Sequence, residues 1–111
     1  MITYTTNHFG LREKDMHYLL SLFVSVPSIE KVVLYGSRAL GHFEKASDID
    51  LALVGSMITN KDVSRIHNLI ECQGPMLLWA DVLHYESLKN KELRRKIDET
   101  GKIIYVKMAT P

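Results

Sequence analysis

Residues 48–54 constrain the fold more than any other segment, because acidic or small side chains alternate there with large apolar ones. Successive side chains of a β-strand point to opposite faces of its sheet. Ile49, Leu51 and Leu53 therefore point into a core, while Asp48 and Asp50 share the other face. Along the strand these two acids are about 6.5–7 Å apart. The segment predicts a strand that is buried on one side and acidic on the other.

Hydrophobic periodicity predicts the other elements around this strand. An apolar run from Lys31 to Tyr35 ends at Gly36, as a buried strand before a sharp turn does. Thr59 or Asn60 is suited to cap a helix that Gly74-Pro75 ends, and Gly101 lies just past another predicted helix. The predicted order is helix, strand, strand, helix, strand, helix, strand, over residues 11–23, 31–35, 48–54, 59–71, 76–85, 90–100 and 103–106.

This order predicts the α/β (α+β) class, with a small mixed sheet of about four strands and helices packed against it. A chain of 111 residues holds one core, so we expect a single domain over residues 1–111. Trp79 and the methionines are expected in that core, with a partner surface as the alternative for some of them. The scattered histidines lack zinc-ligand spacing and are expected in solvent or in the core.

Charge and cysteine content limit the partners. Fourteen basic and thirteen acidic side chains, without a block of like charge, lack the electrostatic pattern of a nucleic-acid-binding protein. Any anionic ligand must then be held by a local site. The single cysteine, Cys72, has no intramolecular partner, and no apolar stretch reaches the roughly 20 residues that cross a bilayer. We expect a cytoplasmic protein without membrane association.

A third acid, Asp81, interrupts the apolar residues of the predicted strand 76–85. An uncompensated carboxylate in a core strand is costly. If this strand lies beside residues 48–54, Asp48, Asp50 and Asp81 share one sheet face. Carboxylates with substrate phosphates are the usual ligands of Mg²⁺, and a third acid can ligate the metal or accept a proton from an attacking hydroxyl. These three acids are the candidate metal and catalytic residues.

The turn after the first predicted strand is the candidate phosphate site. Gly36 and Ser37 open a short helical turn, which presents backbone N–H groups to an anion. Glycine lets the backbone approach closely, and the Ser37 hydroxyl adds a donor. Arg38 either offers a charged fork to phosphate or forms a salt bridge that structures the loop.

Two blocks carry a family resemblance: Gly-Ser-Arg-Ala-Leu-Gly at residues 36–41 and Ser-Asp-Ile-Asp-Leu-Ala-Leu at residues 47–53, followed by Asp81. They resemble the signature of the DNA polymerase β-like nucleotidyltransferases. More closely, they resemble that of the short MNT proteins, the antitoxin halves of HEPN/MNT toxin–antitoxin pairs.

The resemblance implies a nucleotidyltransferase fold and a Mg²⁺-dependent enzyme, with Mn²⁺ as a possible substitute, that uses ATP. It would transfer AMP to a hydroxyl, first of all a tyrosine, on a helical HEPN ribonuclease toxin with which it forms a hetero-oligomer. Asp48 and Asp50 would be metal ligands, Asp81 the third ligand or the base, and Gly36 and Ser37 the phosphate binders.

Two alternatives remain open at this point. A catalytically silent antitoxin would neutralise its partner by binding alone, with the fold as a scaffold. A nucleotidyltransferase could also modify a small molecule. Three intact acids favour an enzyme over a silent scaffold, because close carboxylates repel one another without a metal. The lack of a substrate domain like those of larger relatives favours a protein acceptor.

Overall fold

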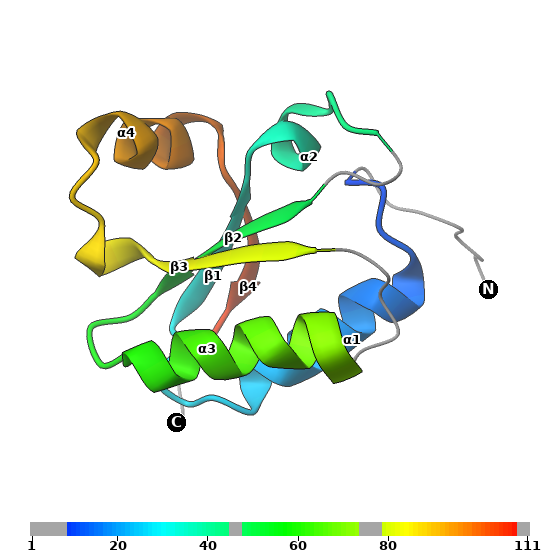
Figure 1. Cartoon of the computed structure of the whole chain (residues 1–111), viewed down its shortest axis with the longest axis vertical. Helices are drawn as coiled ribbons and strands as arrows, with labels where there is room; N and C mark the ends of the chain where they lie inside the picture. The colour runs from blue at the N-terminus through cyan, green and yellow to red at the C-terminus, as the bar shows by residue number, and fades with distance from the viewer. Residues whose placement is uncertain (1–8, 45–47, 74–78, 109–111) are drawn as a thin grey trace.

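The computed structural model describes residues 9–44, 48–73 and 79–108, which form a four-stranded mixed sheet with helices on both faces (Figure 1). The spatial order of the strands is β3-β2-β1-β4. Strand β1 is antiparallel to β2 and to β4, whereas β2 and β3 are parallel. The predicted class and sheet are confirmed. The strands are β1 (Lys31–Tyr35), β2 (Ile49–Val54), β3 (Ala80–His84) and β4 (Lys102–Val106).

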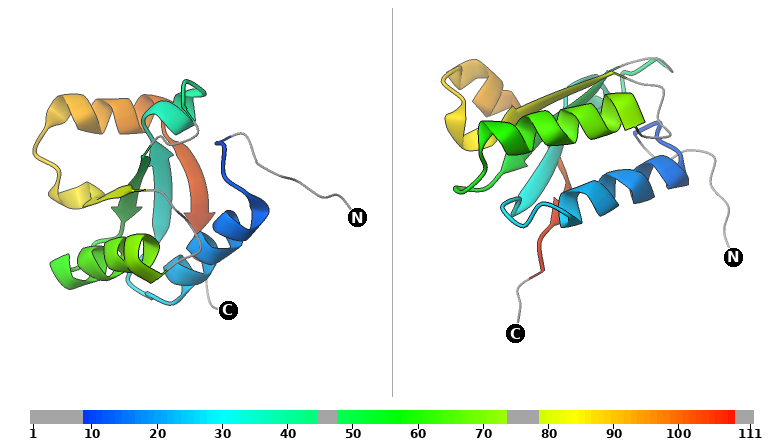
Figure 2. Two further views of the ribbon diagram at one scale, coloured as in Figure 1. Left: turned by 45° about the vertical axis from the view of Figure 1, so that its right-hand side comes forward. Right: turned by 60° about the horizontal axis from the view of Figure 1, so that its bottom comes forward.

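Two helices cover one face of the sheet and a third lies on the other face (Figure 2). Helices α1 (Glu13–Val24) and α3 (Asn60–Asn68) pack against the first face, and α3 continues as a π-helical turn, η1 (Leu69–Gln73). Helix α4 (Lys91–Thr100) packs against the second face. Two short elements complete the fold, α2 (Ser37–Leu40) after β1 and the 3₁₀ turn η2 (Tyr85–Ser87) after β3.

The main core lies between the sheet and the α1/α3 layer. Ile49, Leu51 and Leu53 are fully buried there at 0% exposure, as the period-two pattern predicts. Val33 and Ala52 point to the opposite face and pack with Ile97 of α4. Asp50 lies on this second face because it alternates with the three core residues of β2. The core therefore fixes which face of the sheet carries the acid.

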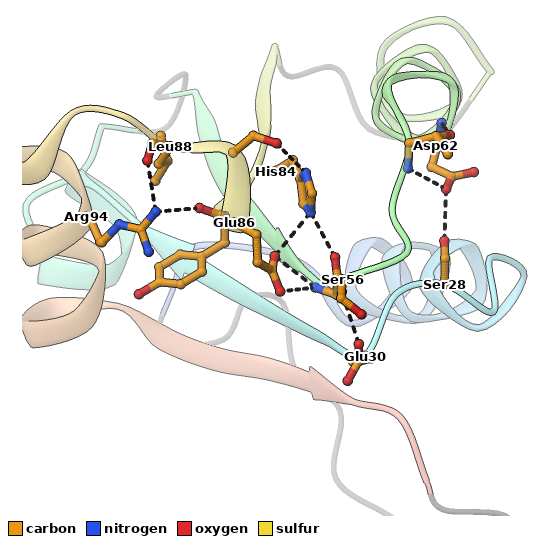
Figure 3. Close-up of polar contacts among 12 residues, drawn as sticks. Ser28, Glu30, Ser56, Asp62, His84, Glu86, Leu88 and Arg94 are labelled. Atoms are coloured by element: carbon orange, nitrogen blue, oxygen red, sulfur yellow. Dashed lines mark hydrogen bonds and ion pairs between the residues drawn. The ribbon is translucent and has the colours of Figure 1, made fainter.

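Polar contacts tie the end of β3 to the turn after β2 (Figure 3). The Gly55 N–H donates to the Glu86 carboxylate at 2.9 and 3.1 Å. His84 Nε2 donates to the Gly55 carbonyl oxygen at 2.8 Å. In the same turn the Ser56 N–H donates to Glu30 Oε2 at 3.2 Å. The two contacts of Gly55 connect β2 with the end of β3 where their parallel pairing stops, and the Ser56 bond joins the same turn to the residue before β1.

The helix starts agree with the sequence signals. Thr59, rather than Asn60, is the cap of α3: its hydroxyl oxygen accepts from the Asp62 N–H at 3.2 Å, and its own N–H donates to the Asp62 carboxylate at 3.0 Å. The Asn90 side chain accepts from the Leu93 N–H at the start of α4. The predicted stop at Gly74-Pro75 lies outside the described residues.

The placement of Trp79 in the core was wrong. Trp79 is 71% exposed, and Met57 and Met108 are also exposed. The strand β3 starts at Ala80 and ends at His84, so Trp79 and Tyr85 lie outside it, and residues 76–78 are not among those described. Trp79 escapes burial because β3 is an edge strand of the sheet and Trp79 comes before its first buried residue, Ala80. No helix among the described residues is long and apolar enough to span a membrane.

Gly101 follows α4 as predicted, but its backbone is not left-handed. Its φ of −67° is available to any residue. The reason for glycine is close packing, because a Cβ at this position would lie 2.4 Å from Val33 Cγ1 and 2.5 Å from the Ile97 carbonyl oxygen. Gly101 therefore lets the end of α4 meet β1, on the face that carries Asp50.

We expect Gly101→Ala to destabilise the protein by about 1–3 kcal/mol, the usual cost of overpacking a tight contact. Urea unfolding followed by circular dichroism measures this difference. Lys96→Ala, on the exposed side of α4, is the matched control and should change stability by less than about 0.5 kcal/mol. Equal stability of Gly101→Ala and the control would contradict the packing argument.

Candidate active site

Strand register brings Tyr35, Asp50 and Asp81 into one row across the sheet. Tyr35 of β1 pairs with Asp50 of β2, and Asp50 pairs with Asp81 of β3. The sequence analysis grouped Asp81 with the other two acids only if its strand lies beside residues 48–54. The parallel pairing of β2 with β3 meets this condition. Asp50 and Asp81 are direct neighbours on the α4 face.

Asp48 lies one residue before β2 and is exposed, and Asp81 is exposed as well. The interpretation of Asp81 as a carboxylate within a core strand was therefore wrong, since β3 forms the edge of the sheet. Only Asp50 is partly buried. The acidic site thus consists of one half-buried carboxylate flanked by two that are open to solvent. Ser47 of the predicted motif lies outside the described residues.

The three charges act on one another. Burial, followed by the negative charges of Asp81 and Asp48, raises the pKa of Asp50 from about 3.8 to about 6. Burial disfavours the ionised form, and so do like charges nearby. A cation bound among these carboxylates would oppose both effects. The electrostatics of the acids therefore favour a cation at this place.

Tyr35 is a member of this site that the sequence analysis did not single out. Its side chain is buried, with 7% exposure, and it forms a side-chain hydrogen bond with Asp81. Burial, and then the charges of Asp81 and Asp50, raise the pKa of the Tyr35 hydroxyl, so this hydroxyl donates to the carboxylate. The signal was present, because alternation along residues 31–35 places Tyr35 on the side of the sheet opposite Leu34.

Gly36 brings the backbone turn directly against Asp50. Its φ of 77° lies in the left-handed region, and a Cβ there would be 2.3 Å from Asp50 Oδ2. Ser37 follows as the first residue of α2 and is part-exposed. The predicted phosphate turn and the acidic row are therefore adjacent. Their adjacency explains why glycine precedes Ser37.

Arg38 is buried at 1% exposure. Its Nη1 donates to the Phe9 carbonyl oxygen at 2.7 Å, and its guanidinium lies 5.2 Å from the centre of the Phe43 ring. Burial lowers its pKa, while the charges of Asp15 and Asp48 act in the opposite direction. These contacts anchor the Arg38 side chain within the loop, but neither of them is the salt bridge that the sequence analysis offered, so that alternative stays a prediction. Direct contact of Arg38 with phosphate stays a prediction.

The three acids suit a metal ion that takes its remaining ligands from water and from substrate phosphates. Within the described part of the chain, no three His, Cys, Asp or Glu side chains are grouped so as to hold a metal by themselves. Mg²⁺ commonly binds through one or two carboxylates and completes its octahedral shell with water and substrate phosphates. Asp48 and Asp81, which are open to solvent, and the half-buried Asp50 beside the Gly36 turn fit this mode of binding.

Comparison with known families shows to which family the chain belongs. The family model described as "Polymerase beta, Nucleotidyltransferase" matches residues 18–109, which include the Gly36 turn and all three acids. The chain belongs to the polymerase β nucleotidyltransferase family. It is a nucleotidyltransferase, as its sequence motifs predict.

Relatives of this nucleotidyltransferase agree with the assignment. A Methanocaldococcus jannaschii protein, named as a candidate protein adenylyltransferase, is 28% identical over 81 residues, which are 69% of this chain and 79% of that protein. A crystal structure of a toxin–antitoxin with AMP-PNP has a TM-score of 0.70 at 18% identity. A mutant form of the toxin–antitoxin MntA-HpeT has a TM-score of 0.67 at 16% identity. Each structural match covers 83% of this chain and 73% of the other, and shows that the fold is shared.

The raised pKa of Asp50 gives a prediction for the nucleotidyltransferase without divalent cations. Below pH 3.8 Asp50 is neutral in the folded and the unfolded chain, whereas above about pH 6 its ionisation opposes folding. We therefore expect Asp50→Asn to melt about 2–5 °C above the parent protein at pH 8, a modest gain because the carboxylate is part-solvated. The difference should shrink as the pH falls from 6 and vanish near pH 4.

Thermal melts in EDTA from pH 4 to pH 8 measure this difference. Glu92→Gln removes an exposed carboxylate of α4 and should show no comparable dependence on pH. An Asp50→Asn protein that is less stable than the parent at pH 8, or whose advantage is the same at every pH, would contradict the electrostatic account.

Proposed function

We propose that this chain is the antitoxin of a HEPN/MNT toxin–antitoxin pair and that it transfers AMP from ATP to a hydroxyl of the partner toxin. The acceptor is a tyrosine in the first instance, on a small helical HEPN ribonuclease that forms a hetero-oligomer with this chain. The observation that carries the proposal is the pairing of Asp50 with Asp81 beside the Gly36 turn. It supports a metal site and a phosphate site that lie side by side.

In this proposal Asp48 and Asp50 would hold Mg²⁺, for which Mn²⁺ can substitute, and Asp81 acts as the base rather than as a third ligand. The bound ion would neutralise developing charge on the phosphates and orient the substrate. Gly36 and Ser37 bind the triphosphate through backbone N–H groups and the serine hydroxyl. Arg38 supports this turn through the hydrogen bond that it donates to the Phe9 carbonyl oxygen.

The chemical step is attack of the acceptor hydroxyl oxygen on the α-phosphorus of ATP. A new P–O bond forms, the bond from the α-phosphorus to the bridging oxygen of the β-phosphate breaks, and pyrophosphate leaves. The hydroxyl proton goes to Asp81, which is exposed and therefore open to an incoming acceptor. Tyr35 holds the Asp81 carboxylate by a hydrogen bond and so orients the base.

The exposure of the acids supports a large acceptor. Asp48 and Asp81 are both open to solvent, so a folded protein can bring a hydroxyl to them from outside. Docking of the partner would exclude water and align the nucleophile with the α-phosphate. Each transferred AMP adds negative charge and bulk. At the active site of a ribonuclease, which must hold RNA phosphate, that addition is inhibitory.

The direct test is to mix this protein with the HEPN partner, ATP and Mg²⁺ and to record the intact mass of the partner. We expect an increase of one or more AMP residues. Asp48→Asn should abolish the increase because it removes a metal ligand, while Glu92→Gln, an exposed acid on α4, should leave it unchanged. The RNase activity of the partner is measured in the same samples.

The same samples separate the alternatives. Full neutralisation of the toxin without a mass change, or equal protection by an Asp48→Asn protein that no longer adds AMP, would establish a silent binding antitoxin. If the partner is neither protected nor increased in mass, the toxin is refuted as the partner, and a small-molecule acceptor becomes the candidate to test. Modification that Asp48→Asn leaves intact would remove this acid from the proposed metal site.

A further inference from the structure

Trp79 is fixed by its backbone beside the acidic site. The Ile49 N–H donates to the Trp79 carbonyl oxygen at 3.0 Å. In the parallel ladder Ile49 pairs with Ala80, so one residue earlier along both strands Asp48 and Trp79 are neighbours. Trp79 is also two residues from Asp81. This tryptophan therefore lies next to two of the three acids.

The alternation of β3, continued to the residue before its start by the bond between the Ile49 N–H and the Trp79 carbonyl oxygen, places Trp79 on the same face as these acids. Ala80 is buried in the core on the α1/α3 side, and its N–H donates to Glu71 Oε2 at 2.7 Å. Asp81 lies on the opposite face, in the row with Asp50. Because side chains two residues apart share a face, Trp79 lies on the Asp81 side. The burial of Ala80 and its hydrogen bond to Glu71, both on the α1/α3 side, keep Trp79 and Asp81 on the opposite face.

The indole is 71% exposed, although Trp is usually among the more buried side chains of a protein. The nearby aromatic residues are engaged differently: Tyr35 is buried, and Phe43 packs against the Arg38 guanidinium. Of these three rings beside the site, Trp79 presents most of its surface to solvent. A flat apolar ring at the rim of a nucleotide site is suited to stacking on a base.

We propose that Trp79 is the platform on which the nucleobase of the nucleoside triphosphate stacks. This inference rests on the proposed nucleotide site. The reacting α-phosphate must lie at the acids, so one ribose separates the base from them. Two residues of strand, roughly 6.5–7 Å, separate Trp79 from Asp81, which suits that separation. Stacking uses the π-face that every base has, and a purine offers the larger ring.

Calorimetric titration with Mg²⁺ and either ATP or inorganic tripolyphosphate tests the platform. Tripolyphosphate has the phosphates without a base. Trp79→Ala should weaken ATP binding about 5- to 100-fold, the usual effect of removing a stacking ring, and leave tripolyphosphate binding unchanged. Trp79→Phe, which keeps a ring, should retain most of the ATP affinity. Met57→Ala, at another exposed apolar side chain outside the site, should match the parent protein with both ligands.

Intrinsic fluorescence gives a second measurement, because Trp79 is the only tryptophan of the chain. Mg²⁺-ATP should quench it, and Mg²⁺-tripolyphosphate should not. Unchanged ATP affinity in Trp79→Ala would overturn the platform and leave the proposed function standing. An equal loss of affinity for ATP and for tripolyphosphate in Trp79→Ala would also overturn the platform. Normal ATP binding by Trp79→Ala, combined with failure to modify the partner, would overturn it too and assign Trp79 to docking of the acceptor. A parent protein that binds neither ligand would refute the nucleotide site itself.

Discussion

The parallel pairing of β2 with β3 is the constraint on which the rest of the site depends. It places Asp50 and Asp81 side by side although 31 positions separate them in the chain. Three features hold the two strands in register: the buried alternation of Ile49, Leu51 and Leu53, the bond from the Ile49 N–H to the Trp79 carbonyl oxygen, and the contacts of His84 and Glu86 with Gly55. A shift of one residue would turn Asp81 to the other face.

This pairing brings together like charges that the fold compensates only in part. The Tyr35 hydroxyl donates a hydrogen bond to Asp81. The charge of Asp50 is not offset in this way, and burial and the neighbouring charges raise its pKa to about 6. Gly36 packs directly against the Asp50 carboxylate, where any side chain would clash. The protein therefore keeps an electrostatically unfavourable group next to a backbone turn suited to phosphate. Perturbed titration behaviour of this kind is typical of functional sites.

Local patterns predicted the elements well, because burial and capping are local. Residues 31–35 and 49–54 alternate or run apolar as their strands require, and Thr59 caps its helix as expected. Features that depend on contacts between distant segments could not be predicted from the sequence. The order of the strands makes β3 an edge strand, and Trp79 and Asp81 are exposed for that reason. The need for glycine at 101 comes from Val33 on a distant strand. The role of Tyr35 emerges only once β1, β2 and β3 are aligned.

In the proposed site Asp48 and Asp50 hold a divalent cation together with the phosphates of ATP. The most direct measurement is calorimetric titration of ATP with and without Mg²⁺, on the parent protein and on the Asp48→Asn plus Asp50→Asn variant. We expect Mg²⁺ to strengthen ATP binding by the parent protein and the variant to lose this dependence while it remains folded. Equal Mg²⁺-dependent affinity in the two proteins would contradict this expectation.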